Sequence, residues 1–211
     1  MTRMLVSFSI ILAAMISTGC QEAVSKSPDA GSAKAGEKKG LTIGDQGPGW
    51  ENLTGTDDKQ HSLKDLEKSK AVAIVFTCNT CPVAQAYEDR LMKLANDYKD
   101  KGVSIVAINV NQDEHNNLDA MKERAEKKGL TYDYLTDPSQ QSARAYGATC
   151  TPHVFLLDKD RKIAYTGAID DNMNADAVKQ HGLQDAIDAV LEGKTPAVTE
   201  TKQFGCGIRY E

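Results

Sequence analysis

Residues 71–82 read AVAIVFTCNTCP, and this stretch decides the fold. The run AVAIVF (71–76) is apolar throughout, which is typical of a strand that a sheet buries on both faces. Cys78 and Cys81 follow it, with two residues between them. Pro82 suits the first turn of a helix, where its missing N–H costs no hydrogen bond. The stretch therefore predicts a buried strand, two closely spaced thiols and the start of a helix.

Helix-like and strand-like patterns alternate in the rest of the chain. The expected helices cover residues 83–98, 118–128, 138–146 and 183–191, and the other expected strands cover 103–110, 132–135, 153–157 and 163–167. This alternation predicts an α/β protein with a central sheet and helices on both faces. The closing order of strand, strand and helix makes the sheet mixed, and a short β-hairpin within 50–63 is expected to extend it at the N-terminal side.

Composition limits the possible partners and chemistry. The chain has 211 residues, 40% of them hydrophobic, and a formal net charge of −5. A mildly acidic chain lacks the basic surface that nucleic acids require, so we expect no nucleic-acid partner. Its five cysteines are too few to hold together a chain of this length, and they suggest thiol chemistry instead.

The N-terminal part of the chain is expected to lie outside the folded domain. Residues 1–19 combine Arg3 with a short apolar stretch ending in Gly19, which predicts a signal peptide. Cys20 then resembles the acylated cysteine of a bacterial lipobox, although an ordinary secretory signal or an uncleaved anchor would also export the chain. Residues 20–40 predict a disordered linker. We therefore expect a cell-envelope protein whose domain lies outside the cytoplasm, anchored by lipid to a bacterial membrane.

Cys78 and Cys81 are predicted to be a redox pair. A thiol at a helix N-terminus faces unpaired N–H groups and the positive end of the helix dipole, which stabilise its thiolate. A second thiol one turn later can close a disulfide with the first. Zinc would need a second closely spaced ligand pair, and Cys150 and Cys206 are too far apart in the sequence to supply one. We expect neither a metal nor a cofactor.

Three motifs carry a family resemblance. They read VFTCNTCP (75–82), YGATCTP (146–152) and FLLD (155–158). On these residues, the segment 41–193 resembles the redoxin branch of the thioredoxin superfamily, close to TlpA/ResA-type proteins and peroxiredoxin-like redoxins. The resemblance implies a thioredoxin-like fold for this segment, with residues 194–211 as a C-terminal tail.

The resemblance also implies a mechanism and partners. The peptide bond between Thr151 and Pro152 should be cis, and the Thr151 backbone should pair like a strand with a bound thiol substrate. Cys78 should attack substrate disulfides, and Cys81 should then resolve the mixed disulfide. The partners implied are protein thiols or disulfides and a membrane redox partner that recharges the site.

Two other functions are possible for a chain with these motifs: peroxide reduction and copper binding. Val75 stands where a peroxiredoxin-like peroxide reductase would carry Thr, which weakens that alternative. A Sco-like copper protein would use Cys78, Cys81 and His153, because thiolates suit Cu(I). Sco proteins, however, space their cysteines one residue further apart.

Two cysteines are left over. Cys150 lies two residues before Pro152, and Cys206 lies in the tail between two glycines. In an oxidising compartment they could form a second disulfide that fixes the tail beside the active site. Both could equally remain free, with Cys206 relaying electrons to the active site. We favour the disulfide.

The lipid anchor gives the first testable prediction. Labelled fatty acid should be incorporated into the wild-type protein and not into a Cys20→Ala variant, because the thiol of Cys20 is the predicted acylation site. Gel fluorography of the purified proteins measures the incorporation. Equal labelling of the two proteins, or none in either, would refute the anchor.

Overall fold

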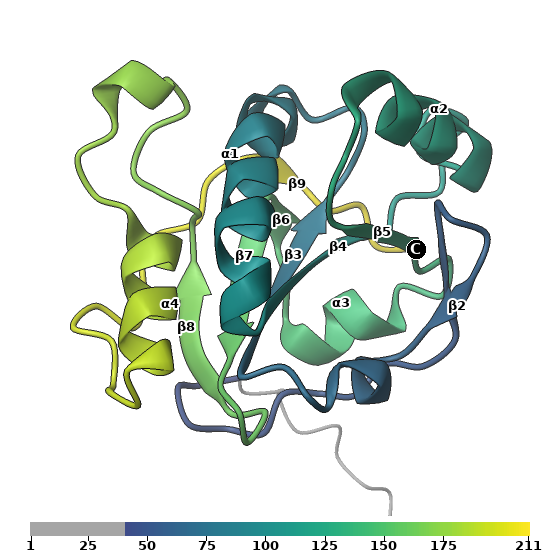
Figure 1. Cartoon of the computed structure of the whole chain (residues 1–211). Coiled ribbons are helices and arrows are strands. Elements are labelled where there is room, and N and C mark those ends of the chain that lie inside the picture. The colour runs from purple at the N-terminus through teal and green to yellow at the C-terminus, as the bar shows by residue number, and fades with distance from the viewer. Residues whose placement is uncertain (1–40) are drawn as a thin grey trace, which may run out of the picture. The chain divides into compact units, whose positions relative to one another are not determined.

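The computed structural model describes residues 41–211 (Figure 1). The predicted signal peptide (1–19), the predicted acylation of Cys20 and the predicted linker (20–40) lie outside these residues. Among the helices of the described part, none is both long and apolar enough to cross a membrane.

A mixed sheet forms the centre of the described residues. Its strands are β1 (Leu53–Gly55), β2 (Gln60–His61), β3 (Ala71–Thr77), β4 (Val103–Asn109), β5 (Asp133–Thr136), β7 (His153–Leu157) and β8 (Ile163–Gly167). They are arranged in the order β2-β1-β5-β4-β3-β7-β8. The β3–β4 and β4–β5 pairs are parallel, and the other pairs are antiparallel. The sheet confirms the predicted α/β, thioredoxin-like class.

Four α-helices lie in the described residues. They are α1 (Pro82–Tyr98), α2 (Leu118–Lys128), α3 (Gln141–Tyr146) and α4 (Gly182–Leu191), with 3-10 turns η1 (Leu63–Leu66), η2 (Lys99–Lys101) and η3 (Ala175–Ala177). Side-chain caps begin α1 and α2 but not α3 and α4. The side chain of Asn117 accepts a hydrogen bond from the Ala120 N–H at 2.9 Å and begins α2. Gly129, with φ of +64°, ends α2 in the left-handed conformation that glycine adopts without strain.

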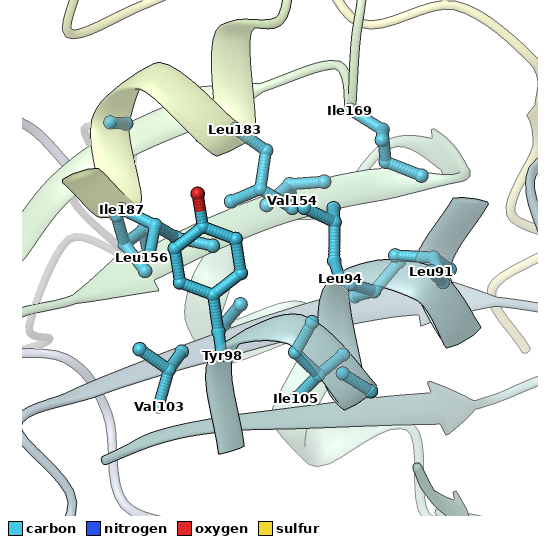
Figure 2. Packing of buried hydrophobic residues seen from close by; sticks show 14 of the residues in the cluster. Leu91, Leu94, Tyr98, Val103, Ile105, Val154, Leu156, Ile169, Leu183 and Ile187 are labelled. Atoms are coloured by element: carbon cyan, nitrogen blue, oxygen red, sulfur yellow. The ribbon is translucent and has the colours of Figure 1, made fainter. Parts of the chain in front are cut away.

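β3 is buried on both faces because the helices divide between them (Figure 1). On one face, Ala71, Ala73 and Val75 pack with α1 and α4. On the other face, Val72, Ile74 and Phe76 pack with α3 and Trp50. Figure 2 shows the first layer: Leu91, Leu94 and Tyr98 of α1, Leu183 and Ile187 of α4, and Val154 and Leu156 of β7. Each Leu or Ile buried in this way contributes about 1.5–3 kcal/mol, so the layer holds α1 and α4 against the sheet.

Residues 194–211 run back over the domain. The backbone N–H of Thr166 in β8 donates to the Thr199 carbonyl at 2.9 Å, and the Thr201 N–H donates to the Thr166 carbonyl at 3.0 Å. Beyond this contact, β9 (Cys206–Gly207) pairs antiparallel with β6 (Cys150–Thr151) in a separate two-stranded sheet. The tail thereby reaches the C-terminal end of β3.

A buried ion pair connects α1 to the segment after β8. Asp170 is buried and forms a salt bridge with Arg90. The hydroxyl of Tyr87 donates to the other Asp170 carboxylate oxygen at 2.7 Å, and Arg90 also donates to the Asn172 carbonyl at 2.8 Å. Because the carboxylate has charged and neutral donors, its burial is compensated.

Removing this carboxylate should destabilise the fold. In Asp170→Ala, the Arg90 guanidinium and the Tyr87 hydroxyl would lose their shared acceptor, and we expect a loss of about 3–5 kcal/mol in the free energy of unfolding. Urea unfolding measures the loss. The exposed Asp176 lies in the same segment, and Asp176→Ala should change stability by less than about 0.5 kcal/mol. Equal stability of the two variants would show that the Asp170 carboxylate does not stabilise the fold.

Candidate active site

The two cysteines lie where β3 ends and α1 begins. Cys81 is the N-cap of α1: its sulfur accepts a hydrogen bond from the Ala84 N–H at 3.4 Å, and Pro82 takes the first helical position. This places the sulfur against the positive end of the helix dipole. Cys78 is 4% exposed and Cys81 is 1% exposed, so Cys78 is the more accessible of the two.

The two thiols pack against each other and titrate as a pair. The neighbouring Cys78 lowers the pKa of Cys81, and Cys206 and the Ala84 N–H lower it further. The neighbouring Cys81 raises the pKa of Cys78, and burial raises it further. The proton that the two sulfurs share therefore favours Cys78, and the thiolate form of Cys81 is stabilised.

Thr151 and Pro152 lie against this pair, and the peptide bond between them is cis. The hydroxyl of Thr151 is 3.3 Å from the Cys78 sulfur. The carbonyl oxygen of Thr151 is 3.0 Å from the Cys81 sulfur and can accept a proton donated by it. One residue thus offers a hydrogen-bond donor to Cys78 and an acceptor to Cys81.

Cys150 and Cys206 are free thiols in the structure, as Cys78 and Cys81 are, and a disulfide between Cys150 and Cys206 stays a prediction. The register of β6 and β9 pairs Cys206 with Thr151 instead of Cys150. Successive side chains in a strand point to opposite faces, so the Cys150 and Cys206 side chains lie on opposite faces of the two strands. The Cys150 thiol donates to the Pro152 carbonyl at 3.7 Å, whereas the Cys206 thiol contacts Cys81.

His153 is placed unfavourably for the copper alternative. Its Nδ1 accepts from the Thr149 N–H at 3.3 Å, and its Nε2 lies 3.3 Å from the Thr166 hydroxyl. Burial lowers the pKa of this imidazole to about 4, so it is neutral. Within residues 41–211, no group of three His, Cys, Asp or Glu side chains is arranged to hold a metal.

The sequence motifs did not reveal the residue that holds the active-site loop. Asn116 is fully buried and accepts a hydrogen bond from the Asn79 N–H at 2.8 Å. Its amide donates to the Thr80 hydroxyl at 3.2 Å, and the Asn109 amide donates to its backbone carbonyl at 3.1 Å. The hydroxyl of Tyr134 also donates to the Asn79 side chain at 2.8 Å. Both residues between the cysteines are therefore fixed from another part of the chain.

Loss of this anchor should slow catalysis. Asn116→Ala leaves the buried Asn79 N–H unpaired, which should cost about 1–3 kcal/mol of stability. Because the loop positions both sulfurs, we expect insulin disulfide reduction to slow by about 10-fold or more.

The neighbouring Asn117 provides a control. Asn117→Ala removes the N-cap of α2 and should cost about 1 kcal/mol while leaving the rate of insulin reduction unchanged. An unchanged rate in Asn116→Ala would show that the loop does not need this anchor.

Comparisons with known proteins agree with the geometry. The redoxin family model matches residues 30–181. The thiol-disulfide oxidoreductase ResA of Geobacillus thermodenitrificans is 30% identical over 148 residues, which are 69% of this chain and 79% of the relative. The ResA protein of Bacillus anthracis is 30% identical over 127 residues, 60% of this chain and 70% of the relative.

Solved structures show the same similarity. A hypothetical protein from Sinorhizobium meliloti 1021 is 32% identical with a TM-score of 0.76, covering 82% of this chain and 97% of that one. An uncharacterized conserved protein from Geobacillus kaustophilus is 36% identical with a TM-score of 0.75, covering 81% and 93%. The chain therefore belongs to the redoxin family, as a TlpA/ResA-like member with a thioredoxin-like fold.

Proposed function

We propose that this protein is an exported, membrane-tethered thiol–disulfide oxidoreductase that works through the Cys78–Cys81 pair. The observation that carries the proposal is the contact of both sulfurs with Thr151, next to a cis proline and at the start of α1. As a ResA-like redoxin, the chain is a thiol–disulfide oxidoreductase, and this pair is where its geometry supports the exchange.

The two positions of the shared proton assign the steps. When the proton moves to Cys81, the thiol can donate to the Thr151 carbonyl, and the Cys78 thiolate can accept from the Thr151 hydroxyl. Cys78 then attacks one sulfur of a substrate disulfide, and the other sulfur leaves as a thiolate. Cys81 gives up its proton and attacks Cys78, which releases the second substrate sulfur. The substrate gains two electrons from the pair, one proton from Cys81 and one proton from water, and the protein keeps a Cys78–Cys81 disulfide.

This exchange needs no cofactor, because sulfur atoms carry the electrons throughout. The peroxide and copper alternatives have less support. Val75, which stands where a peroxidase would carry Thr, is a buried apolar residue of β3. Both ring nitrogens of His153, the third ligand of the copper alternative, face threonine groups.

The cellular setting follows from the N-terminal sequence. A signal peptide over 1–19 and a lipid on Cys20 would place the domain outside the cytoplasm, joined to a membrane by the linker 20–40. Its substrates would be protein thiols or disulfides. Its electrons would then come from, or go to, a dithiol protein of that membrane, because cytosolic thiols do not reach the compartment.

Cysteine variants test the assignment. Cys78→Ser should abolish insulin disulfide reduction, because it removes the attacking sulfur. Cys81→Ser should accumulate a mixed disulfide through Cys78, because nothing displaces the substrate. Non-reducing electrophoresis and mass spectrometry detect both effects. Cys150→Ser serves as the control and should retain activity. Full activity in Cys78→Ser would overturn the proposed mechanism.

A further inference from the structure

We infer that Cys206 is a third redox-active cysteine, which exchanges disulfides with Cys81 from a tail strand lying where a substrate strand would bind. The inference rests on the proposed function, because it supplies an additional sulfur to the same pair. Four observations carry it: the pairing of β9, the placement of Cys206, the fit of Gly205 and the anchoring of the chain end.

β9 occupies the strand edge beside the active-site sulfurs. Thr151, which contacts both sulfurs, has Cys206 as its register partner, and the Ile208 N–H donates to the Thr149 carbonyl at 3.1 Å. The Thr151 hydroxyl lies 3.5 Å from the Cys206 carbonyl oxygen. An extended segment that adds to a sheet edge in this way is how a peptide is presented to a binding protein. Here the presented segment carries a thiol.

Cys206 lies beside the Cys81 sulfur, because it pairs with Thr151, whose carbonyl oxygen is 3.0 Å from that sulfur. The neighbouring Cys81 raises the pKa of Cys206 to about 11. The two sulfurs are therefore close neighbours in the folded protein. Cys206 is also exposed, whereas Cys78 and Cys81 are buried. Cys206 is thus a solvent-accessible sulfur in direct contact with the buried pair.

Gly205 is fitted to this position. Its φ is +150°, and a Cβ on it would lie 1.9 Å from the Thr151 carbonyl oxygen. Any other residue at this site would force β9 away from Thr151. A Cβ on Gly207, on the other side of Cys206, would meet nothing within 4 Å.

The residues after β9 hold the strand in place. The Tyr210 hydroxyl donates to the Ala148 carbonyl at 2.5 Å, and the Gln140 amide donates to the Arg209 carbonyl at 2.9 Å. The guanidinium of Arg144 lies 4.5 Å from the centre of the Tyr210 ring. A sulfur held next to another in this way has a high effective concentration.

The exchange is balanced without another reactant. In the oxidised protein, Cys206 loses its proton and its thiolate attacks Cys81. The Cys81–Cys206 bond forms, the Cys78–Cys81 bond breaks, and Cys78 takes up a proton. The number of disulfides does not change, but the disulfide now includes an exposed sulfur, which a partner dithiol can reach.

The test uses the full chain with Cys78→Ser, which leaves Cys81 without its usual partner. On oxidation with oxidised glutathione, we expect a Cys81–Cys206 disulfide in non-reducing peptide maps. Adding Gly205→Ala should slow its formation at least 10-fold, whereas adding Gly207→Ala should not change the rate. Insulin reduction by the Gly205→Ala protein with Cys78 intact verifies that this substitution still allows folding.

Two results would overturn the inference. One is alkylation of both Cys81 and Cys206 after oxidation. The other is an equal rate of disulfide formation in the Gly205→Ala and Gly207→Ala proteins. Insulin reduction by the wild-type protein measures the Cys78–Cys81 exchange separately, so the proposed function and this inference can fail independently.

Discussion

The burial of β3 on both faces is the constraint on which the rest of the structure depends. Its side chains alternate between a layer formed with α1 and α4 and a layer formed with α3 and Trp50. Because β3 pairs with β4 on one side and β7 on the other, its position is fixed in every direction. The chain leaves this rigid strand at Thr77 and enters α1 at Pro82. The two thiols therefore lie on a short connection whose ends cannot move independently.

Thr151 turns this rigid connection into a chemical site. Its hydroxyl faces Cys78, its carbonyl oxygen faces Cys81, and its other edge pairs with β9. Pro152 has no N–H to donate, and β7 begins only at the next residue, His153. Thr151 thus contacts both sulfurs of the cysteine pair and also pairs with the strand beside it. That strand is the tail in this structure and would be a substrate segment in a complex.

Buried polar residues position the loop between the cysteines and the first turns of α1. Asn116 fixes the loop between the cysteines from the segment before α2, and Asp170 fixes the first turns of α1 from the segment after β8. Both side chains are buried with several partners, so their hydrogen bonds offset the cost of removing them from water. An apolar side chain at either position would pack without directing the loop.

The sequence by itself determined the order of the elements, the mixed sheet and the position of two cysteines at the start of a helix. These features depend on local patterns: a continuous apolar run for β3, helical spacing for α1, and two cysteines next to Pro82. The N-terminal hairpin could be predicted on the same grounds, since turn residues separate its short strands. The cis bond before Pro152 was implied by the family resemblance and is present in the structure.

Only the tertiary structure decided the partners of Cys206 and Asn116. Sequence distance allowed Cys206 to reach Cys150, but the register of β6 and β9 places it opposite Thr151 and against Cys81. Asn116 gives no sequence signal, since an asparagine before a helix is usually a cap, and here Asn117 fills that role. Register and the direction of a side chain depend on contacts between residues far apart in the chain, and no local pattern specifies them.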